Sequence, residues 1–133
     1  MTERATGAQL LQQISGNILT PEGWFNGRIG FGEKISAISG AACDPGANGD
    51  HYIIPGFVDL HVHGGGGADI MQGGDAANVV AAMHARHGTT SLLATTMTAP
   101  PDQVLAALSA IGQACGQRGR GAARILGVHL EGP

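Results

Sequence analysis

Two histidines that stand two residues apart, His61 and His63, end an apolar run that begins at Phe57. Side chains alternate along a β-strand, so a strand here points both imidazoles to one face, with Asp59 one step below them. Two converging imidazoles are suited to binding a divalent transition metal. A pair of packed or solvent-facing histidines is the alternative. The glycine run Gly64–Gly67 that follows favours a metal site, because such a run marks a loop that must approach something closely.

A second pair, His129 and Glu131, has the same spacing and therefore shares one strand face. Gly132 and Pro133 behind it predict a turn, which places Glu131 at the rim of the sheet. A carboxylate there can bind a metal, act as a base or cap a loop, and the spacing leaves all three roles open. We take Glu131 as a candidate third metal ligand and His129 as a candidate supporting residue.

Five further residues are candidates to line a substrate pocket or to support the ligands. Asp59 precedes the histidine pair, Gly64 and Gly65 directly follow it, and Thr95 and Thr96 end the next predicted strand. The two threonines could equally be capping residues.

Two other histidines, His84 and His87, lie three apart on a predicted helix and so share one helix face. We interpret His84 as a packed or exposed side chain. His87 is typical of a last-turn residue near a helix C-terminus. A helix on the outside of a barrel faces away from its mouth, so we do not expect this pair to bind metal.

The segments that carry these residues alternate between strand-like and helix-like periodicity. The predicted order is strand 57–63, helix 75–87, strand 89–95, helix 101–115 and strand 124–130. The second helix has an apolar stripe of Val104, Leu105, Leu108 and Ile111. This alternation indicates an α/β class with a parallel sheet. Periodicity alone does not separate a doubly wound sheet from a (β/α)₈ barrel, although the first junction lacks the G-x-G-x-x-G of a dinucleotide fold.

Residues 9–55 read as short β-strands, at 14–19, 26–31, 34–38 and 52–54, with turns at 21–23 and 44–49. Strands this short do not close a stable sheet alone, so we expect part of a small β-domain. The pattern changes at Pro55 and Gly56. This change predicts a boundary between a domain at 1–55 and a second at 56–133.

Composition excludes several classes of protein. Net charge is -3 and the seven Lys and Arg residues are scattered, so no basic surface is available for nucleic acid. No apolar run approaches the roughly 18 residues of a membrane span. Residues 1–11 lack the apolar core of a signal peptide. The two isolated cysteines, Cys43 and Cys115, fit a reducing compartment. We expect a cytoplasmic protein.

Three motifs together resemble one enzyme family. Pro55–His63 resembles the first-strand signature of the amidohydrolase superfamily, whose members carry a small β-sandwich beside a (β/α)₈ barrel. His87–Ser91 and, above all, His129–Pro133 resemble the N-acetylglucosamine-6-phosphate deacetylases. The similarity runs from about Ile14 to the last residue. It implies that residues 1–55 are part of the sandwich and that residues 56–133 form the first three strands of the barrel.

The resemblance also implies a site and a reaction. Glu131 matches the family's glutamate ligand, and His61 and His63 match the pair that binds metal in members able to hold two ions. The cofactor is a divalent metal, expected to be zinc, as one or two ions. The implied reaction converts N-acetylglucosamine 6-phosphate to glucosamine 6-phosphate and acetate. The family's other histidine ligands and its catalytic aspartate fall beyond Pro133, and the full-length protein is expected to be a homodimer.

Two alternatives remain. The first is another amidohydrolase, dihydroorotase-like or deaminase-like, which shares the H-x-H pair. The second is a non-enzymatic remnant, because three strands fall short of the eight that a barrel needs. We expect the 133 residues on their own, as an N-terminal fragment without the aspartate, not to hydrolyse the amino-sugar phosphate.

Overall fold

The computed structural model describes residues 12–117 and 119–132. Contacts divide the chain into two compact units, Met1–Pro55 and Gly56–Pro133. The segment 1–11, which we examined for a signal peptide, lies outside the described residues. Among those described, no helix is both long enough and apolar enough to cross a bilayer.

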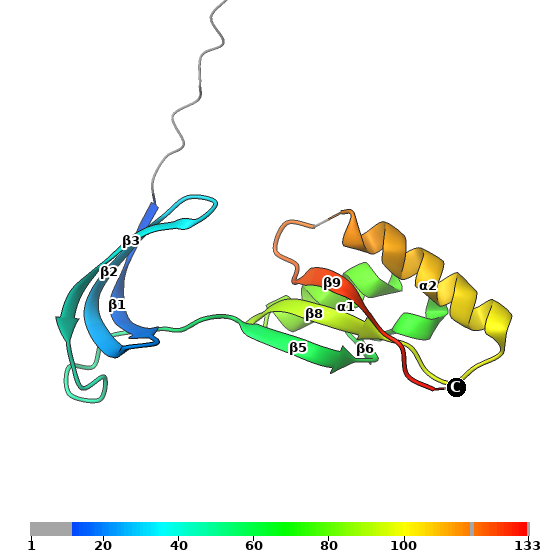
Figure 1. Ribbon diagram of the computed structural model, residues 1–133, viewed down its shortest axis with the longest axis horizontal. Helices are drawn as coiled ribbons and strands as arrows, with labels where there is room; N and C mark the ends of the chain where they lie inside the picture. The colour runs from blue at the N-terminus through cyan, green and yellow to red at the C-terminus, as the bar shows by residue number, and fades with distance from the viewer. Residues whose placement is uncertain (1–11, 118, 133) are drawn as a thin grey trace, which may run out of the picture. The chain divides into compact units, whose positions relative to one another are not determined.

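The first unit is one four-stranded sheet with the order β3-β2-β1-β4 (Figure 1). Its strands are β1 (Gln12–Thr20), β2 (Gly23–Phe31), β3 (Ile35–Ala42) and β4 (Tyr52–Ile53). β2 pairs antiparallel with β1 and β3, and β4 runs parallel to β1. β2 begins three residues earlier than the sequence predicted, because Trp24 and Phe25 pair with Leu19 and Ile18 across the turn. The second layer that a sandwich needs stays a prediction.

The second unit has a mixed α/β fold, as the sequence predicted. Its main strands, β5 (Phe57–Val62), β8 (Thr89–Thr95) and β9 (Arg124–His129), form a parallel sheet in the order β5-β8-β9. The helices α1 (Ala76–Ala85) and α2 (Pro101–Cys115) connect them. The sheet order therefore follows the chain order, with one helix between successive strands (Figure 1).

The core of this unit lies between the sheet and the helices. The strands contribute Val62, Leu92, Ala94 and Ile125, and the helices contribute Ala77, Val80, Ala81, Ile111 and Ala114. Small alanine side chains on both helices allow close approach to the sheet. The predicted stripe of α2 was wrong at Leu105, which is 65% exposed. The buried positions are Ala107, Ile111 and Ala114. Two of these three are alanines, so the buried face of α2 is not the face marked by its largest apolar side chains.

A small hairpin that the sequence did not predict follows β5. β6 (Gly64–Gly65) pairs antiparallel with β7 (Ala68–Asp69), and a single 3₁₀ turn, η1 (Ile70–Gln72), comes next. Gly66 and Gly67 link the strands with φ of 65° and 82°. A two-residue hairpin turn of this kind needs left-handed φ at both positions, which glycine adopts without strain. The glycine run therefore forms an ordered turn.

A buried hydroxyl ties the first two strands of the sheet together. Thr95 is fully buried, and its Oγ1 accepts a hydrogen bond of 2.9 Å from the Val62 backbone N–H. We expect Thr95→Val to lower the free energy of unfolding by about 1–3 kcal/mol, because it leaves that buried N–H without a partner. Urea unfolding followed by the circular dichroism of the helices measures the loss.

Thr90→Val is the matched control. Thr90 lies in the same strand but is exposed, and its hydroxyl bonds to the Phe57 carbonyl at 3.3 Å, where water can replace it. Equal effects of the two substitutions would contradict this account of Thr95.

Candidate metal centre

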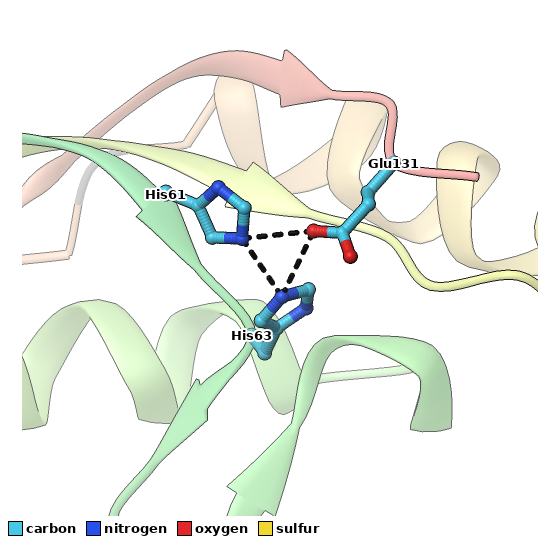
Figure 2. A group of neighbouring side chains, drawn as sticks. All are labelled: His61, His63 and Glu131. Carbon is cyan, nitrogen blue, oxygen red and sulfur yellow. Dashed lines mark hydrogen bonds and ion pairs between the residues drawn. The ribbon is translucent and has the colours of Figure 1, made fainter.

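Three side chains meet where β5 and β9 end (Figure 2). His61 lies within β5, His63 directly follows that strand, and Glu131 comes two residues after β9. His61 Nε2 lies 2.8 Å from Glu131 Oε2, and His63 Nε2 lies 3.2 Å from the same oxygen. The two Nε2 atoms are 2.9 Å apart. The structure therefore brings together the three residues that the sequence selected as candidate ligands.

Protons alone do not account for this triangle. Each imidazole Nε2 carries either one proton or one lone pair, and both lie along one direction in the ring plane. Two protons fill at most two of the three edges, so the third edge brings together two donors or two lone pairs. One cation that accepts a lone pair from each atom satisfies all three at once. The arrangement is therefore better suited to an ion than to hydrogen bonds.

The donor set and its dimensions fit a transition metal. Two imidazole nitrogens and one carboxylate oxygen form a typical zinc ligand set. Ligand atoms that share one tetrahedral zinc ion at about 2.1 Å lie about 3.4 Å from one another. The observed separations of 2.8–3.2 Å need to open by only a few tenths of an ångström. The side chains of His61, His63 and Glu131 are 50%, 33% and 45% exposed, so an ion and water can reach them.

Asp59 lies next to His61 but outside the cluster of His61, His63 and Glu131. Asp59 pairs with Leu92 and Val62 pairs with Ala94, so β5 holds one more residue than β8 between these two pairs. The extra residue therefore lies in the stretch that contains His61. The Asp59 carboxylate accepts a hydrogen bond of 3.2 Å from the His61 backbone N–H. It supports the backbone of a candidate ligand and is not part of the triangle.

His129 packs against His61. Their ring centroids are 4.7 Å apart with an interplanar angle of 75°, an edge-to-face contact. His129 Nδ1 lies 3.1 Å from the Leu60 carbonyl oxygen, to which it donates when protonated. β9 also carries an extra residue, because Leu92 pairs with Ile125 and Leu93 with Gly127. That shift sets His129 beside Thr95 at the end of the sheet.

Thr95 and Thr96 are both fully buried, so their side chains hold the backbone and are not exposed to a ligand. Thr96 Oγ1 accepts a hydrogen bond of 3.2 Å from the Glu131 backbone N–H. The Thr96 N–H donates to the His129 carbonyl at 3.1 Å. Glu131 therefore keeps its position after β9 has ended.

The glycines after His63 sit in tight packing. A Cβ on Gly64 would lie 2.6 Å from the Ala68 carbonyl oxygen, and one on Gly65 would lie 3.0 Å from His84 Nε2. His84 is half-buried and its Nε2 lies 3.1 Å from the Gly64 carbonyl oxygen. His87 is exposed and lies beyond the end of α1. Nothing in the sequence indicated that His84 contacts this hairpin, because the contact depends on how α1 packs.

Sequence and structure comparisons show which known proteins the chain is similar to. No model of a known protein family matches the chain. It is 43% identical over 122 residues to N-acetylgalactosamine-6-phosphate deacetylase of Escherichia coli O157:H7, covering 87% of this chain and 31% of that protein. It is 34% identical over 118 residues to N-acetylglucosamine-6-phosphate deacetylase of Bacillus subtilis, covering 81% and 30%. This chain is a homologue of amino-sugar-6-phosphate deacetylases.

Solved structures agree. The N-acetylglucosamine-6-phosphate deacetylase of Thermotoga maritima superposes with a TM-score of 0.76 at 30% identity, over 92% of this chain and 32% of that one. The D267A mutant of the Mycobacterium smegmatis N-acetyl-D-glucosamine-6-phosphate deacetylase was solved in complex with N-acetyl-D-glucosamine-6-phosphate. It superposes with a TM-score of 0.70 at 31% identity, over 92% of this chain and 33% of that one. The homologues are hydrolases that act on amides. The chain spans about a third of the length of the curated relatives that it matches.

We expect the chain to bind Zn²⁺ and Glu131→Gln to weaken that binding. Removing a residue that only hydrogen-bonds to a ligand lowers metal affinity about 10–100-fold. Glu131→Gln should lower the Zn²⁺ affinity by more, because it removes a negatively charged ligand. Competition with a chromophoric chelator measures the affinity. Glu22→Gln is the control, because it makes the same change at an exposed turn residue. Equal affinities of the two variants would show that Glu131 is not a ligand.

Proposed function

We propose that this chain supplies part of the metal site of a hydrolase that removes the acetyl group from N-acetylglucosamine 6-phosphate, giving glucosamine 6-phosphate and acetate. The observation that carries the proposal is the convergence of His61, His63 and Glu131 on one point. The homology to deacetylases supports the choice of reaction. The activity belongs to a protein in which further residues complete the site, since the chain matches about a third of its relatives.

The three side chains have distinct roles in this proposal. A divalent ion held there would polarise a carbonyl oxygen and would lower the pKa of a bound water to about 7, far below that of free water. His61 and His63 contribute neutral lone pairs, and the Glu131 carboxylate offsets part of the positive charge. Their partial exposure leaves one side of the site open to an acetamide group. The aspartate that the resemblance implies for proton transfer to the leaving amine lies beyond Pro133.

We also propose that the second unit forms the first three strands of a (β/α)₈ barrel. Its three strands follow one another in chain order, as a barrel requires. One half of a doubly wound sheet has the same order, so the choice of a barrel rests on the resemblance to the deacetylases. In a barrel, the C-terminal strand ends form the active-site face, which is where the candidate ligands meet. Zinc as the metal, one or two ions, a cytoplasmic location and a homodimer remain predictions from the residues and the resemblance.

A second substrate has an observation in its favour. The Escherichia coli relative, at 43% identity, acts on N-acetylgalactosamine 6-phosphate, which differs from the glucosamine substrate in the configuration at C4. The reacting acetamide and the phosphate are the same in both. The candidate metal site therefore serves either sugar, and the choice rests on groups that contact the C4 hydroxyl.

A chimera tests the proposed function. This chain replaces the matching third of the Escherichia coli relative, and acetate release is measured with both sugar phosphates, with and without a chelator. We expect chelator-sensitive turnover that Glu131→Gln lowers at least about 10²-fold, because loss of metal chemistry removes several kcal/mol of transition-state stabilisation.

The matched control is the same chimera with Glu22→Gln, which should retain its rate. A folded chimera in which Glu131→Gln keeps full activity would rule out Glu131 as part of the machinery. A higher kcat/KM for the galactosamine substrate would favour the second candidate.

A further inference from the structure

We propose that His84 is a positioning residue for the candidate metal site: its imidazole fixes the glycine hairpin whose first residue follows the ligand His63. This inference rests on the proposed function, because it takes His63 as a ligand. The sequence had suggested only a packed or exposed side chain.

His63 depends on its backbone for its position. β5 ends at Val62, so the strand ladder does not hold His63 itself. Its Nδ1 atom is buried and makes no hydrogen bond to any part of the chain that the structure describes. Metal-binding histidines usually donate this second ring N–H to a partner that sets the ring orientation. Apart from the contacts of its Nε2 with His61 and Glu131, His63 is held by the backbone that follows, where its carbonyl accepts a bond of 2.8 Å from the Ile70 N–H.

The segment between these two residues has little rigidity of its own. It is a hairpin of two-residue strands joined by glycines, and a two-stranded hairpin alone is marginally stable in water. Glycine also loses more conformational freedom on ordering than any other residue. The hairpin must therefore be held by something outside it.

His84 supplies that restraint from the last turn of α1. Its Nε2 lies 3.1 Å from the Gly64 carbonyl oxygen. A carbonyl only accepts hydrogen bonds, so Nε2 is the donor and carries the proton. A protonated Nε2 has no lone pair for a metal, and His84 is not among the described residues that cluster at the candidate site. The bond fixes the peptide group between Gly64 and Gly65, directly after the residue that follows His63.

The packing around this bond is close and rests on a rigid base. A Cβ on Gly65 would lie 3.0 Å from His84 Nε2, and one on Gly66 would lie 3.3 Å from Met83 Cβ. The hairpin therefore lies directly on α1. The helix buries Val80 and Ala81 in the core between helices and sheet. A continuous path leads from that core through His84 and the Gly64 carbonyl to the backbone of His63.

Three variants of the 133-residue chain test the inference: His84→Ala, His84→Gln and, as the matched control, His87→Ala. Glutamine places an amide N–H near the position of the histidine Nε2 and should restore the bond. The readouts are Zn²⁺ affinity by chelator competition, the visible spectrum of bound Co²⁺ and the thermal unfolding midpoint. We expect His84→Ala to weaken Zn²⁺ binding about tenfold and to alter the Co²⁺ bands. His84→Gln and His87→Ala should stay within about threefold of the unchanged chain.

The outcomes separate this inference from the proposed function. If the unchanged chain binds Zn²⁺ and His84→Ala binds it equally well, the role of His84 is overturned while the site stands. If the unchanged chain binds no Zn²⁺, the site and the inference both fail. A purely structural role would lower the unfolding midpoint without changing the Co²⁺ bands of the folded protein. If His84→Ala does not fold, a folded His84→Gln with weak Zn²⁺ binding overturns the inference.

Discussion

The candidate metal centre depends on one close contact, in which a single carboxylate oxygen of Glu131 faces two imidazole nitrogens within 3.2 Å. The ligands come from β5 and from the residues after β9, and these strands are separated by β8. Because β5 and β9 do not pair, their ligands meet only if both strands are held in fixed positions relative to β8. Buried hydroxyls at the end of β8 do this on both sides, because Thr95 bonds to β5 and Thr96 to the backbone of Glu131.

Departures from regular strand geometry position the candidate ligands. β5 carries one residue more than β8 between Asp59 and Val62, and β9 carries one more between Ile125 and Gly127. Bulges of this kind often re-aim side chains next to active sites. The backbone N–H of His61 bonds to the side chain of Asp59, close to the extra residue of β5. The edge-to-face contact with His129 then limits the tilt of the His61 ring. The strands, their extra residues and the side-chain packing therefore together set the positions of His61 Nε2, His63 Nε2 and Glu131 Oε2.

The sequence predicted the elements, the ligand candidates and several residues that support them, among them Asp59, Thr96 and His129, but not the contacts that depend on packing. Period-two and helical patterns are local, so the parallel strands and both helices of the second unit were predicted with ends within three residues of those observed. The equal spacing of His61 with His63 and of His129 with Glu131 indicated the strand ends where the site forms. The extra residues in β5 and β9, the hairpin at Gly64–Asp69 and the contact of His84 with Gly64 were not predicted. They depend on register and packing between segments that lie far apart in sequence.

The central claim is that His61, His63 and Glu131 together hold one divalent ion. X-ray absorption at the zinc edge of the zinc-loaded chain tests it most directly, because imidazole, carboxylate and thiolate ligands give different scattering. The account predicts a first shell of nitrogen and oxygen at about 2.0–2.2 Å, with outer-shell scattering from two imidazole rings. A sulfur shell at about 2.3 Å from a cysteine, or a shell without imidazole scattering, would contradict it.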